Sequence, residues 1–259
     1  MTKIIGISGK KQSGKTSIGN FLFGCAMVSN EVVEYATIDD YGSLVVPYEE
    51  EDGTLKPCVF PVDSIHPEMI KYMEENVWNK VKIYSFADSL KRLCVNVLGL
   101  TERQCYGTEK DKSSLTQFNW SDMIFYEEKR TSCPMTAREV MQYVGTDFFR
   151  KIYPEVWVDS TIRQIEKDKP ELAVIVDCRF PNEANGIKNA GGKVIRLTRN
   201  IFGEQDQHRS ETALDNYDNF DATIDNHEMS IKEQNETVYN QLIDWKVVDF
   251  KAVAGSSNS

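Results

Sequence analysis

A glycine-rich segment near the start of the chain has the residue types and spacing of a phosphate-binding loop. Gly9, Gly14, Lys15 and Thr16 satisfy the pattern GxxxxGK(S/T). In such a loop, backbone N–H groups surround the phosphates of a nucleoside triphosphate, the lysine reaches the β and γ phosphates, and the hydroxyl binds Mg²⁺. The alternative is a chance glycine turn with an exposed lysine. We predict a nucleoside triphosphate site with Mg²⁺ as cofactor, and Lys15 as a catalytic residue. The predicted cofactor-binding residues are Gly9, Ser13, Gly14, Lys15, Thr16 and Ser17, whereas the side chains of Lys10, Lys11 and Ser13 are assigned no chemistry.

A second candidate residue for the magnesium site follows the segment of the chain that is most typical of a β-strand. Asp177 closes the apolar segment 172–176, as an acid that orients hydrated magnesium beside a phosphate loop does. An ordinary strand exit or a helix N-cap gives the same pattern. The upstream loop favours the metal interpretation, so Thr16 and Asp177 are the predicted magnesium residues and Asp177 is also predicted to be catalytic.

The class of phosphate-loop protein can be narrowed from motifs that are missing. The sequence has neither an Asn-Lys-x-Asp motif that reads guanine nor the Ser-Gly-Gly signature of transport ATPases. A kinase for a nucleotide or another small molecule remains, and it needs arginines to neutralise the transferring phosphoryl group. Arg179 and Arg199 follow two predicted strands and are predicted to be catalytic, and Arg209 lies in a polar segment that could close as a lid.

Composition excludes several other classes. The chain has 259 residues and a formal net charge of −10, which argues against a nucleic-acid polymer as partner. It has no apolar run long enough for a membrane span and no signal-peptide pattern, so we expect a cytoplasmic protein that does not bind membranes. Its six cysteines are scattered without a CxxC pair, and its three histidines have no i, i+4 spacing, so we expect reduced thiols and no histidine-built metal site.

The elements that must position these residues alternate between strand and helix. An apolar strand over 3–8 leads into the loop, and a helix with one apolar face follows over 17–28. Helices are predicted over 67–79, from Thr136 with Glu139 as its capping-box partner, over 156–167, and before 191–192. Further strands are predicted over 80–86, 172–177, 193–198 and 222–224. This order predicts an α/β, three-layer P-loop NTPase fold with a five-stranded parallel sheet.

The remaining segments are predicted to be additions to one domain over 1–250. Two apolar runs flank an acidic turn within 40–66, and prolines confine this inserted β-hairpin to an edge or a protruding flap. We expect 101–134 to be an acceptor-side or lid region, 200–220 to be a lid, and 251–259 to be a disordered tail.

Several short motifs beyond the loop resemble those of the bacteriophage deoxynucleoside monophosphate kinases. They occur in that family's order and spacing over about 3–242: FADSLK at 86–91, MQYVGTD at 141–147, Trp157, DCRFPNE at 177–183, GKVIRLTR at 192–199, HRSE at 208–211 and ATIDN at 222–226. The resemblance implies that the γ-phosphoryl group of ATP is transferred to a deoxynucleoside 5′-monophosphate. It also implies a central first strand, a homodimer, and the host cytoplasm if the protein is encoded by a phage.

The substrate-binding residues implied by these motifs each have a plainer alternative. Asp88 and Lys91 would hold the sugar and the α phosphate, or they form a local capping pair. Arg138 and Gln142 share a helix face that would reach the acceptor, or that face is solvated, and the glycine at 145 would end this helix. Trp157 would stack on the base or pack in the core. The full predicted set is Asp88, Lys91, Arg138, Gln142, Thr146, Asp147, Trp157, Glu183, His208, Arg209 and Glu211.

Two other functions remain open from the sequence. The first is a kinase for a different phosphorylated metabolite, such as phosphomevalonate or dephospho-coenzyme A. The second is a regulator that binds a nucleotide in the same loop without catalysis. No general base is expected in a deoxynucleoside monophosphate kinase or in a kinase for one of these other metabolites, because the acceptor phosphate is already an anion at neutral pH.

Overall fold

The computed structural model describes residues 1–124, 133–200 and 212–249, and they fall into two compact units. Unit 1 takes its residues from Met1–Ser85 and Ile162–Ser259, and unit 2 is Phe86–Thr161. The phosphate loop and the main sheet belong to unit 1. The predicted tail 251–259 and half of the predicted lid, 201–211, lie outside the described residues.

The sheet of unit 1 has the predicted five parallel strands. Their spatial order is β10, β9, β1, β8, β5, so the first strand is central, as the family resemblance implied. The bounds agree with the predictions to within two residues: β1 Lys3–Ser8, β5 Val81–Tyr84, β8 Leu172–Cys178, β9 Lys193–Leu197 and β10 Ala222–Ile224. The carboxyl end of β1 therefore meets the ends of its neighbours at one sheet edge, where ligands bind in open α/β sheets.

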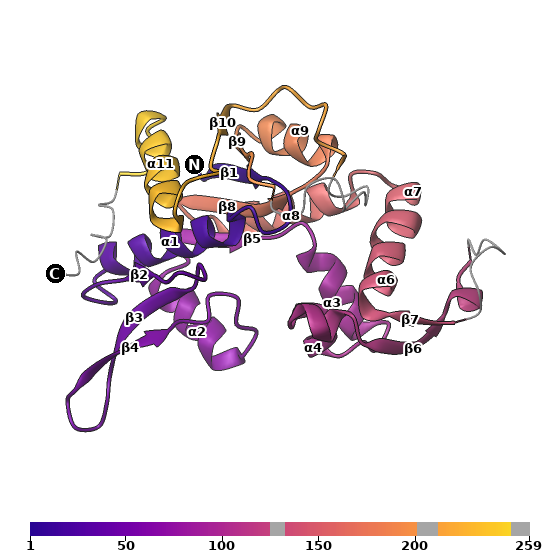
Figure 1. Cartoon of the computed structure of the whole chain (residues 1–259), viewed down its shortest axis with the longest axis horizontal. Helices are drawn as coiled ribbons and strands as arrows, with labels where there is room; N and C mark the ends of the chain where they lie inside the picture. The colour runs from indigo at the N-terminus through magenta and orange to yellow at the C-terminus, as the bar shows by residue number, and fades with distance from the viewer. Residues whose placement is uncertain (125–132, 201–211, 250–259) are drawn as a thin grey trace. The chain divides into compact units, whose positions relative to one another are not determined.

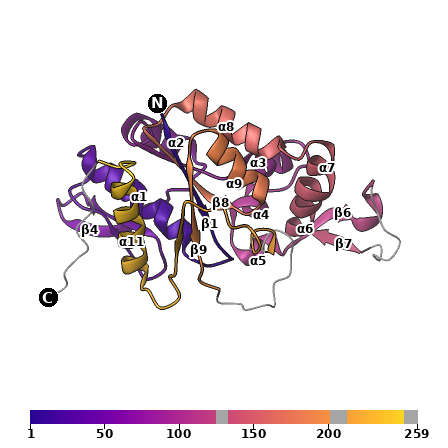
Figure 2. The same cartoon turned by 90° about the horizontal axis from the view of Figure 1, so that it is seen from above.

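Helices cover both faces of this sheet, which confirms the three-layer prediction (Figure 2). Helices α1 (Lys15–Ser29) and α11 (Ile231–Asp244) lie on one side, and α9 (Pro181–Asn189) lies on the other. Successive side chains of β1 point to opposite faces of the sheet, which explains why helices pack on both of its faces. Ile5 and Ile7 belong to the core shared with α1, whereas Gly6 faces α9 and has no room for a Cβ beside Ile187.

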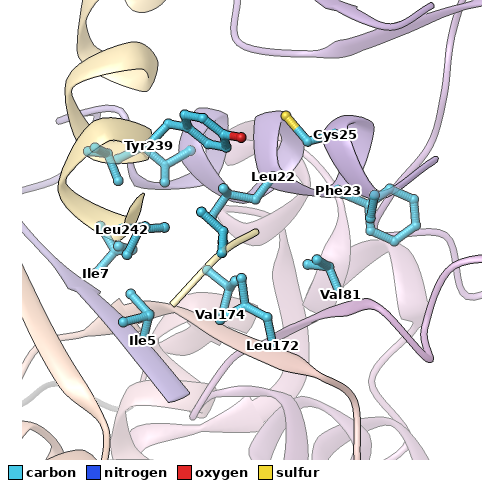
Figure 3. Packing of buried hydrophobic residues seen from close by; sticks show 14 of the residues in the cluster. Ile5, Ile7, Leu22, Phe23, Cys25, Val81, Leu172, Val174, Tyr239 and Leu242 are labelled. Carbon is cyan, nitrogen blue, oxygen red and sulfur yellow. The ribbon is translucent and has the colours of Figure 1, made fainter. Parts of the chain in front are cut away.

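The main hydrophobic core lies between the sheet and helices α1 and α11. Figure 3 shows Leu22 of α1 and Leu242 of α11 above Ile5, Leu172 and Val174 of the sheet. All five side chains are at most 1% exposed. This packing fixes the start of α1, and therefore the end of the phosphate loop, against the sheet.

The predicted hairpin is confirmed and belongs to a separate three-stranded sheet. Strands β3 (Leu44–Glu49) and β4 (Leu55–Val59) extend away from helix α2 (Pro67–Asn76), and the short strand β2 (Thr37–Ile38), which was not predicted, pairs with β3 (Figure 1). Pro47 lies opposite Pro57 at a position where the two paired residues exchange no backbone hydrogen bonds. The residue pairs on either side supply those bonds, so neither proline, which lacks an N–H group, removes a hydrogen bond from the hairpin.

Unit 2 contains more regular structure than its sequence suggested. The segment expected to be a lid or linker holds two short helices, each begun by a capping box: Thr101 with Gln104, and Thr108 with Asp111. A buried cluster that includes Cys94, Met135 and Val140 supports them. The described elements are α3 Asp88–Asn96, α4 Glu102–Tyr106, α5 Glu109–Lys112, β6 Leu115–Asn119, η1 Trp120–Asp122, β7 Pro134–Thr136, α6 Ala137–Gln142, η2 Tyr143–Phe149 and α7 Arg150–Ile152. Helix α8 (Val156–Asp168) begins in unit 2 and ends in unit 1.

The prediction that the helix ends around Gly145 was wrong. The helix continues from α6 through the π-helical segment η2 and into α7. Gly145 is absent from the residues with positive φ, so it is not a left-handed cap. A Cβ at Gly145 would lie 2.6 Å from Cδ2 of Leu90, which shows that the glycine serves close packing against α3.

Helix α11 was not predicted, although its start has a recognisable signal. Ser230 and Glu233 form a capping box in which the Ser230 hydroxyl accepts from the Glu233 amide and the Glu233 carboxylate accepts from the Ser230 amide. Among the described helices, none combines the length and the apolar character that a membrane crossing requires.

Candidate active site

The phosphate loop joins the end of β1 to the start of α1, as the motif requires. Gly14 immediately precedes the helix and has φ +98°, a conformation that favours glycine. A Cβ there would also lie 2.5 Å from Nε2 of Gln234. The local backbone and the space around it therefore both require glycine at this position.

Lys15 lies inside the loop and is only 7% exposed. Its ammonium group donates to the carbonyl oxygens of Gly9 at 2.8 Å and Lys10 at 2.6 Å, and it lies 3.4 Å from the hydroxyl of Ser13. The structure thus brings together four of the predicted loop residues, Gly9, Ser13, Gly14 and Lys15, around one positive charge. A lysine ammonium group enclosed by the backbone of a glycine-rich loop is the arrangement that a polyphosphate can use.

Two buried side-chain amides hold the loop from the side of α11. Nδ2 of Asn226 donates to the carbonyl of Ser13 at 2.8 Å and to Oε1 of Gln234 at 2.6 Å. Nε2 of Gln234 donates to the carbonyl of Gly14 at 3.2 Å. Both amides have zero exposure. We call Asn226 and Gln234 the amide clamp.

The amide clamp helps to set the direction of the N–H groups that follow each carbonyl, together with the backbone hydrogen bond of α1 in which the Gly14 carbonyl accepts from the Ile18 amide at 3.2 Å. No cis peptide occurs in the described residues, and in a trans peptide the N–H points opposite to the C=O. Because the carbonyls of Ser13 and Gly14 point at the clamp, the N–H groups of Gly14 and Lys15 point away from it. The loop amides are therefore pre-oriented without a ligand having to turn the peptides.

A third buried amide anchors the first turn of α1. Asn235 Nδ2 lies 3.1 Å from the hydroxyl of Ser17, which in turn lies 3.4 Å from Asn235 Oδ1. The side chains of both residues are thus used to hold α1 against α11, which leaves the backbone of Ser17 for the predicted nucleotide contact. Sequence reasoning missed Gln234 and Asn235, and the available signal was a polar pair in a helix that buries Val238 and Leu242.

The two predicted magnesium residues offer the oxygen chemistry that this ion prefers. Thr16 is exposed in the first turn of α1, and Asp177 is half-buried near the end of β8. Ser85 donates to Oδ2 of Asp177 at 2.6 Å and so orients the carboxylate. Within the described ranges, no group of three or more His, Cys, Asp or Glu side chains could hold a metal. A hydroxyl and a carboxylate fit Mg²⁺, which takes few protein ligands and completes its shell with water and phosphate.

The predicted arginine Arg199 binds the turn that carries the clamp. Its guanidinium donates to the carbonyl of Asn226 at 3.0 and 2.7 Å and to the carbonyl of Met229. Its own amide donates to Oδ1 of Asn226 at 2.8 Å. Arg199 therefore fixes the orientation of Asn226 from two directions, a role that the sequence did not suggest.

Arg179 and Glu183 meet at the start of α9. The Glu183 carboxylate accepts from the amide of Arg179 at 2.6 Å and from that of Phe180 at 3.0 Å, and Glu183 is 2% exposed. Glu183 thus satisfies N–H groups at the helix start, where a negative charge is favoured. Glu183 therefore holds the start of α9, and the substrate contact that its motif suggested stays a prediction.

In unit 2, the structure brings Asp88 and Lys91 together around Tyr106. The Lys91 ammonium lies 4.9 Å from the centre of the Tyr106 ring, and Asp88 lies 3.6 Å from Arg92. Burial, together with the negative charge of Asp88, raises the pKa of the Tyr106 hydroxyl. Both charged side chains remain partly exposed.

Arg138 and Gln142 both lie in α6, where a spacing of four residues gives them one face. The capping box of Thr136 and Glu139 that starts this helix is confirmed. Arg138 also forms an ion pair at 2.7 Å with Glu109 of α5, a contact that the sequence did not indicate. Arg138 therefore links α6 to α5, and its contact with the acceptor stays a prediction.

The last predicted residues of unit 2 lie in or beside the π-helical segment. Thr146 and Asp147 are half-buried within η2. Trp157 is 5% exposed, its indole N–H donates to the carbonyl of Gly145 at 3.1 Å, and its ring packs on Phe149 with 5.4 Å between ring centres. The structure favours the core-packing interpretation of Trp157 over base stacking. His208, Arg209 and Glu211 lie outside the described residues.

Comparison with known proteins gives a consistent result. The family model described as deoxynucleotide monophosphate kinase matches residues 3–238. The chain is 30% identical over 171 residues to a protein of Acanthamoeba polyphaga mimivirus named, provisionally, as a deoxynucleotide monophosphate kinase; this covers 61% of the chain and 79% of the relative. It is also 35% identical over 68 residues to the deoxynucleoside-5′-monophosphate kinase of Escherichia phage T5, which covers 26% of the chain and 24% of that relative.

Proposed function

The chain belongs to the deoxynucleotide monophosphate kinase family, and from this premise we propose that it transfers the γ-phosphoryl group of ATP to a deoxynucleoside 5′-monophosphate. The products are ADP and the deoxynucleoside diphosphate. The single observation that carries the assignment of ATP to this chain is the loop 9–16, in which Lys15 is enclosed and the peptide planes are held by the amide clamp.

The proposed reaction needs positioning and charge neutralisation from the protein. An oxygen of the acceptor phosphate forms a bond to the γ phosphorus, and the bond from that phosphorus to the bridging β–γ oxygen breaks. The electron pair stays on the oxygen of the leaving ADP. The amides of the loop and the ammonium group of Lys15 stabilise the negative charge on the β and γ phosphates, and no residue has to remove a proton.

We assign Mg²⁺ to Thr16 and Asp177. When bound, Mg²⁺ would supply positive charge that neutralises the polyphosphate. Thr16 would supply its hydroxyl, Asp177 would supply a carboxylate oxygen, and Ser85 would keep that carboxylate in one orientation through the 2.6 Å hydrogen bond.

The two predicted catalytic arginines receive different roles. Arg179 follows β8 directly and is half-buried, and we propose that it contacts the transferring phosphoryl group. Arg199 donates to two backbone carbonyls and its amide donates to Asn226, so we propose that it acts as a positioning residue for the amide clamp.

Unit 2 is the proposed source of the acceptor contacts. Lys91 would hold the α phosphate, Asp88 would orient Lys91 or the sugar, and Arg138 and Gln142 would contact the acceptor from one face of α6. Thr146 and Asp147 are retained as candidates because π-helical segments occur often at functional sites. The proposed compartment is the cytoplasm, which holds these nucleotide pools, and the proposed assembly is a homodimer, which light scattering after gel filtration would test.

A coupled assay of ADP formation tests this function. Deoxynucleoside monophosphates are expected to stimulate ADP release, whereas phosphomevalonate and dephospho-coenzyme A are not. Stimulation only by one of those two metabolites would support the other kinase, and tight ATP binding with no acceptor-dependent ADP would support the non-catalytic regulator. The family match favours neither alternative.

A further inference from the structure

A cluster of three charged side chains lies beside the phosphate loop, outside the residues that the proposed mechanism uses. Lys10 of the loop lies 2.6 and 2.7 Å from the two carboxylate oxygens of Asp215. The guanidinium of Arg196, from β9, lies 3.5 Å from Oδ1 of the same carboxylate. One anion is therefore shared by two cations from distant parts of the sequence.

Arg196 is held firmly at the end of the first strand. It pairs with Ser8 in the register of β1 and β9, and its guanidinium donates to the Ser8 hydroxyl at 3.0 Å. It also lies over the ring of Phe220, at 5.6 Å from the ring centre. Ser8 is the residue directly before Gly9, so Arg196 is anchored where the loop begins.

The three side chains differ in their exposure to solvent. The side chains of Lys10 and Arg196 are 19% and 14% exposed, whereas that of Asp215 is 42% exposed. The carboxylate can move into water at little cost, but the two cations are mostly enclosed. Because Asp215 is the most exposed of the three side chains, an anionic ligand can replace it at a lower cost in burial than the movement of either cation would require.

We propose that Lys10 and Arg196 form a subsite for a phosphate group of a nucleotide substrate, and that the Asp215 carboxylate occupies this subsite in place of the phosphate. Phosphate oxygens bind lysine and arginine in the same way as a carboxylate, with more charge and more acceptor atoms. A substrate phosphate would therefore displace Asp215 and gain two charged contacts. This inference rests on the proposed nucleotide binding at the loop.

The competing explanation is an ordinary surface ion pair. Exposed pairs contribute little to stability, and their removal leaves ligand binding unchanged. The subsite makes the opposite prediction, because Asp215 competes with the ligand for the same cations. Removing the carboxylate charge should then strengthen phosphate binding, even though it removes an ion pair from the protein.

Calorimetric titration of the full-length chain tests the inference, with ATP in one arm and a deoxynucleoside monophosphate in the other. Asp215→Asn is expected to lower the Kd by about threefold or more in the arm whose phosphate uses the subsite. That arm identifies the source of the phosphate. Lys10→Gln is expected to raise the Kd in the same arm, and Asp215→Asn should have a much smaller effect in the Lys10→Gln background.

Asp218→Asn is the matched control, since Asp218 is an exposed carboxylate three residues away that forms no ion pair with Lys10 or Arg196 in the described chain. An equal gain in this variant would point to net charge alone and overturn the subsite. The subsite is also overturned if Asp215→Asn leaves both Kd values unchanged or raises them. If these shifts occur but no deoxynucleoside monophosphate stimulates ADP formation, the proposed function fails and the subsite stands.

Discussion

At the scale of single residues, the amide clamp is the feature that distinguishes this phosphate loop from a flexible glycine turn. Asn226 and Gln234 are buried and satisfied by each other and by the loop carbonyls. A buried amide that lost its partner would carry the full cost of its desolvation, so the network strongly favours one loop conformation.

Gln234→Glu is expected to weaken ATP binding about tenfold or more. The substituted carboxylate has the same shape, but it cannot donate to the Gly14 carbonyl and it repels it. Calorimetric titration with ATP measures the effect.

The matched control is Gln241→Glu, the same chemical change on the same helix, which should leave the Kd unchanged. An unaltered Kd in Gln234→Glu would show that the clamp does not orient the loop.

The sequence identified one part of this site and missed another for a clear reason. Gly14 and Lys15 are next to each other in a local pattern, and the chemistry of that pattern is general. The partners of the loop carbonyls lie more than 200 positions away along the chain. The packing of α11 against α1 positions Gln234, and the turn after β10, which Arg199 binds, positions Asn226. Tertiary partners of this kind leave no local spacing to recognise.

At the scale of elements, the π-helical segment η2 replaces the turn that the sequence suggested. A glycine in a helix commonly marks its end, and that rule gave the wrong prediction at Gly145. The alternative cause, close approach of α3, depends on which residue packs opposite, and Leu90 is more than 50 positions earlier in the chain.

Gly145→Ala is expected to destabilise the protein by about 1 to 2 kcal/mol, because the added methyl group would meet Cδ2 of Leu90 at 2.6 Å. Denaturant unfolding measures the change.

Leu90→Ala in the same chain should relieve part of that cost, so the double variant is expected to be more stable than the sum of the two single changes predicts. Strict additivity would show that the two residues do not press on each other.

Asp168, at the end of α8, links this helix to β5. Its carboxylate accepts from Lys82 at 2.7 Å, from Tyr84 at 2.9 Å and from Gln164 at 2.7 Å. Burial would raise the pKa of Asp168, but the Lys82 ammonium and the two hydrogen bonds hold that pKa below its ordinary value.

The lowered pKa of Asp168 predicts a pH dependence of stability. Below about pH 4 the unfolded chain binds a proton at this residue more readily than the folded chain does. The stabilisation is therefore present above that pH and is lost as the pH falls through the folded pKa.

Asp168→Asn should lower the free energy of unfolding at pH 7 and flatten its decline in acid, as measured by urea unfolding at several pH values. Asp244→Asn, a change at an exposed carboxylate outside this network, should preserve the slope of the unmodified protein. An identical acid slope in Asp168→Asn would contradict the linkage.

At the scale of the whole molecule, the strands of the main sheet and the family were accessible from sequence because both depend on short patterns. Apolar runs predicted all five strands of the main sheet, and the resemblance to the kinase family implied that the first of them is central. The capped helices of 101–122 were missed because each is only one turn or so long and has no apolar period. Helix α11 was missed although Ser230 and Glu233 marked its start.

The proposed roles of single residues show the same difference between local sequence patterns and contacts that form only in the folded chain. Lys15 belongs to the phosphate-loop motif, a local sequence pattern that recurs in proteins that bind nucleoside triphosphates, so its role can be predicted from the sequence. Lys10, Arg196 and Asp215 acquire a possible role only through their meeting in space. The structure therefore adds most where side chains from distant segments share one partner.

We propose that the loop 9–16 delivers the γ-phosphoryl group of ATP to a deoxynucleoside monophosphate, and the transfer of a ³²P label follows this step. With γ-labelled ATP and each acceptor in turn, we expect the label in the deoxynucleoside diphosphate, and we expect Lys15→Met to reduce this transfer by at least about 100-fold while circular dichroism stays unchanged. Label that remains in ATP or appears only as inorganic phosphate, or undiminished transfer by the Lys15→Met variant, would contradict the account.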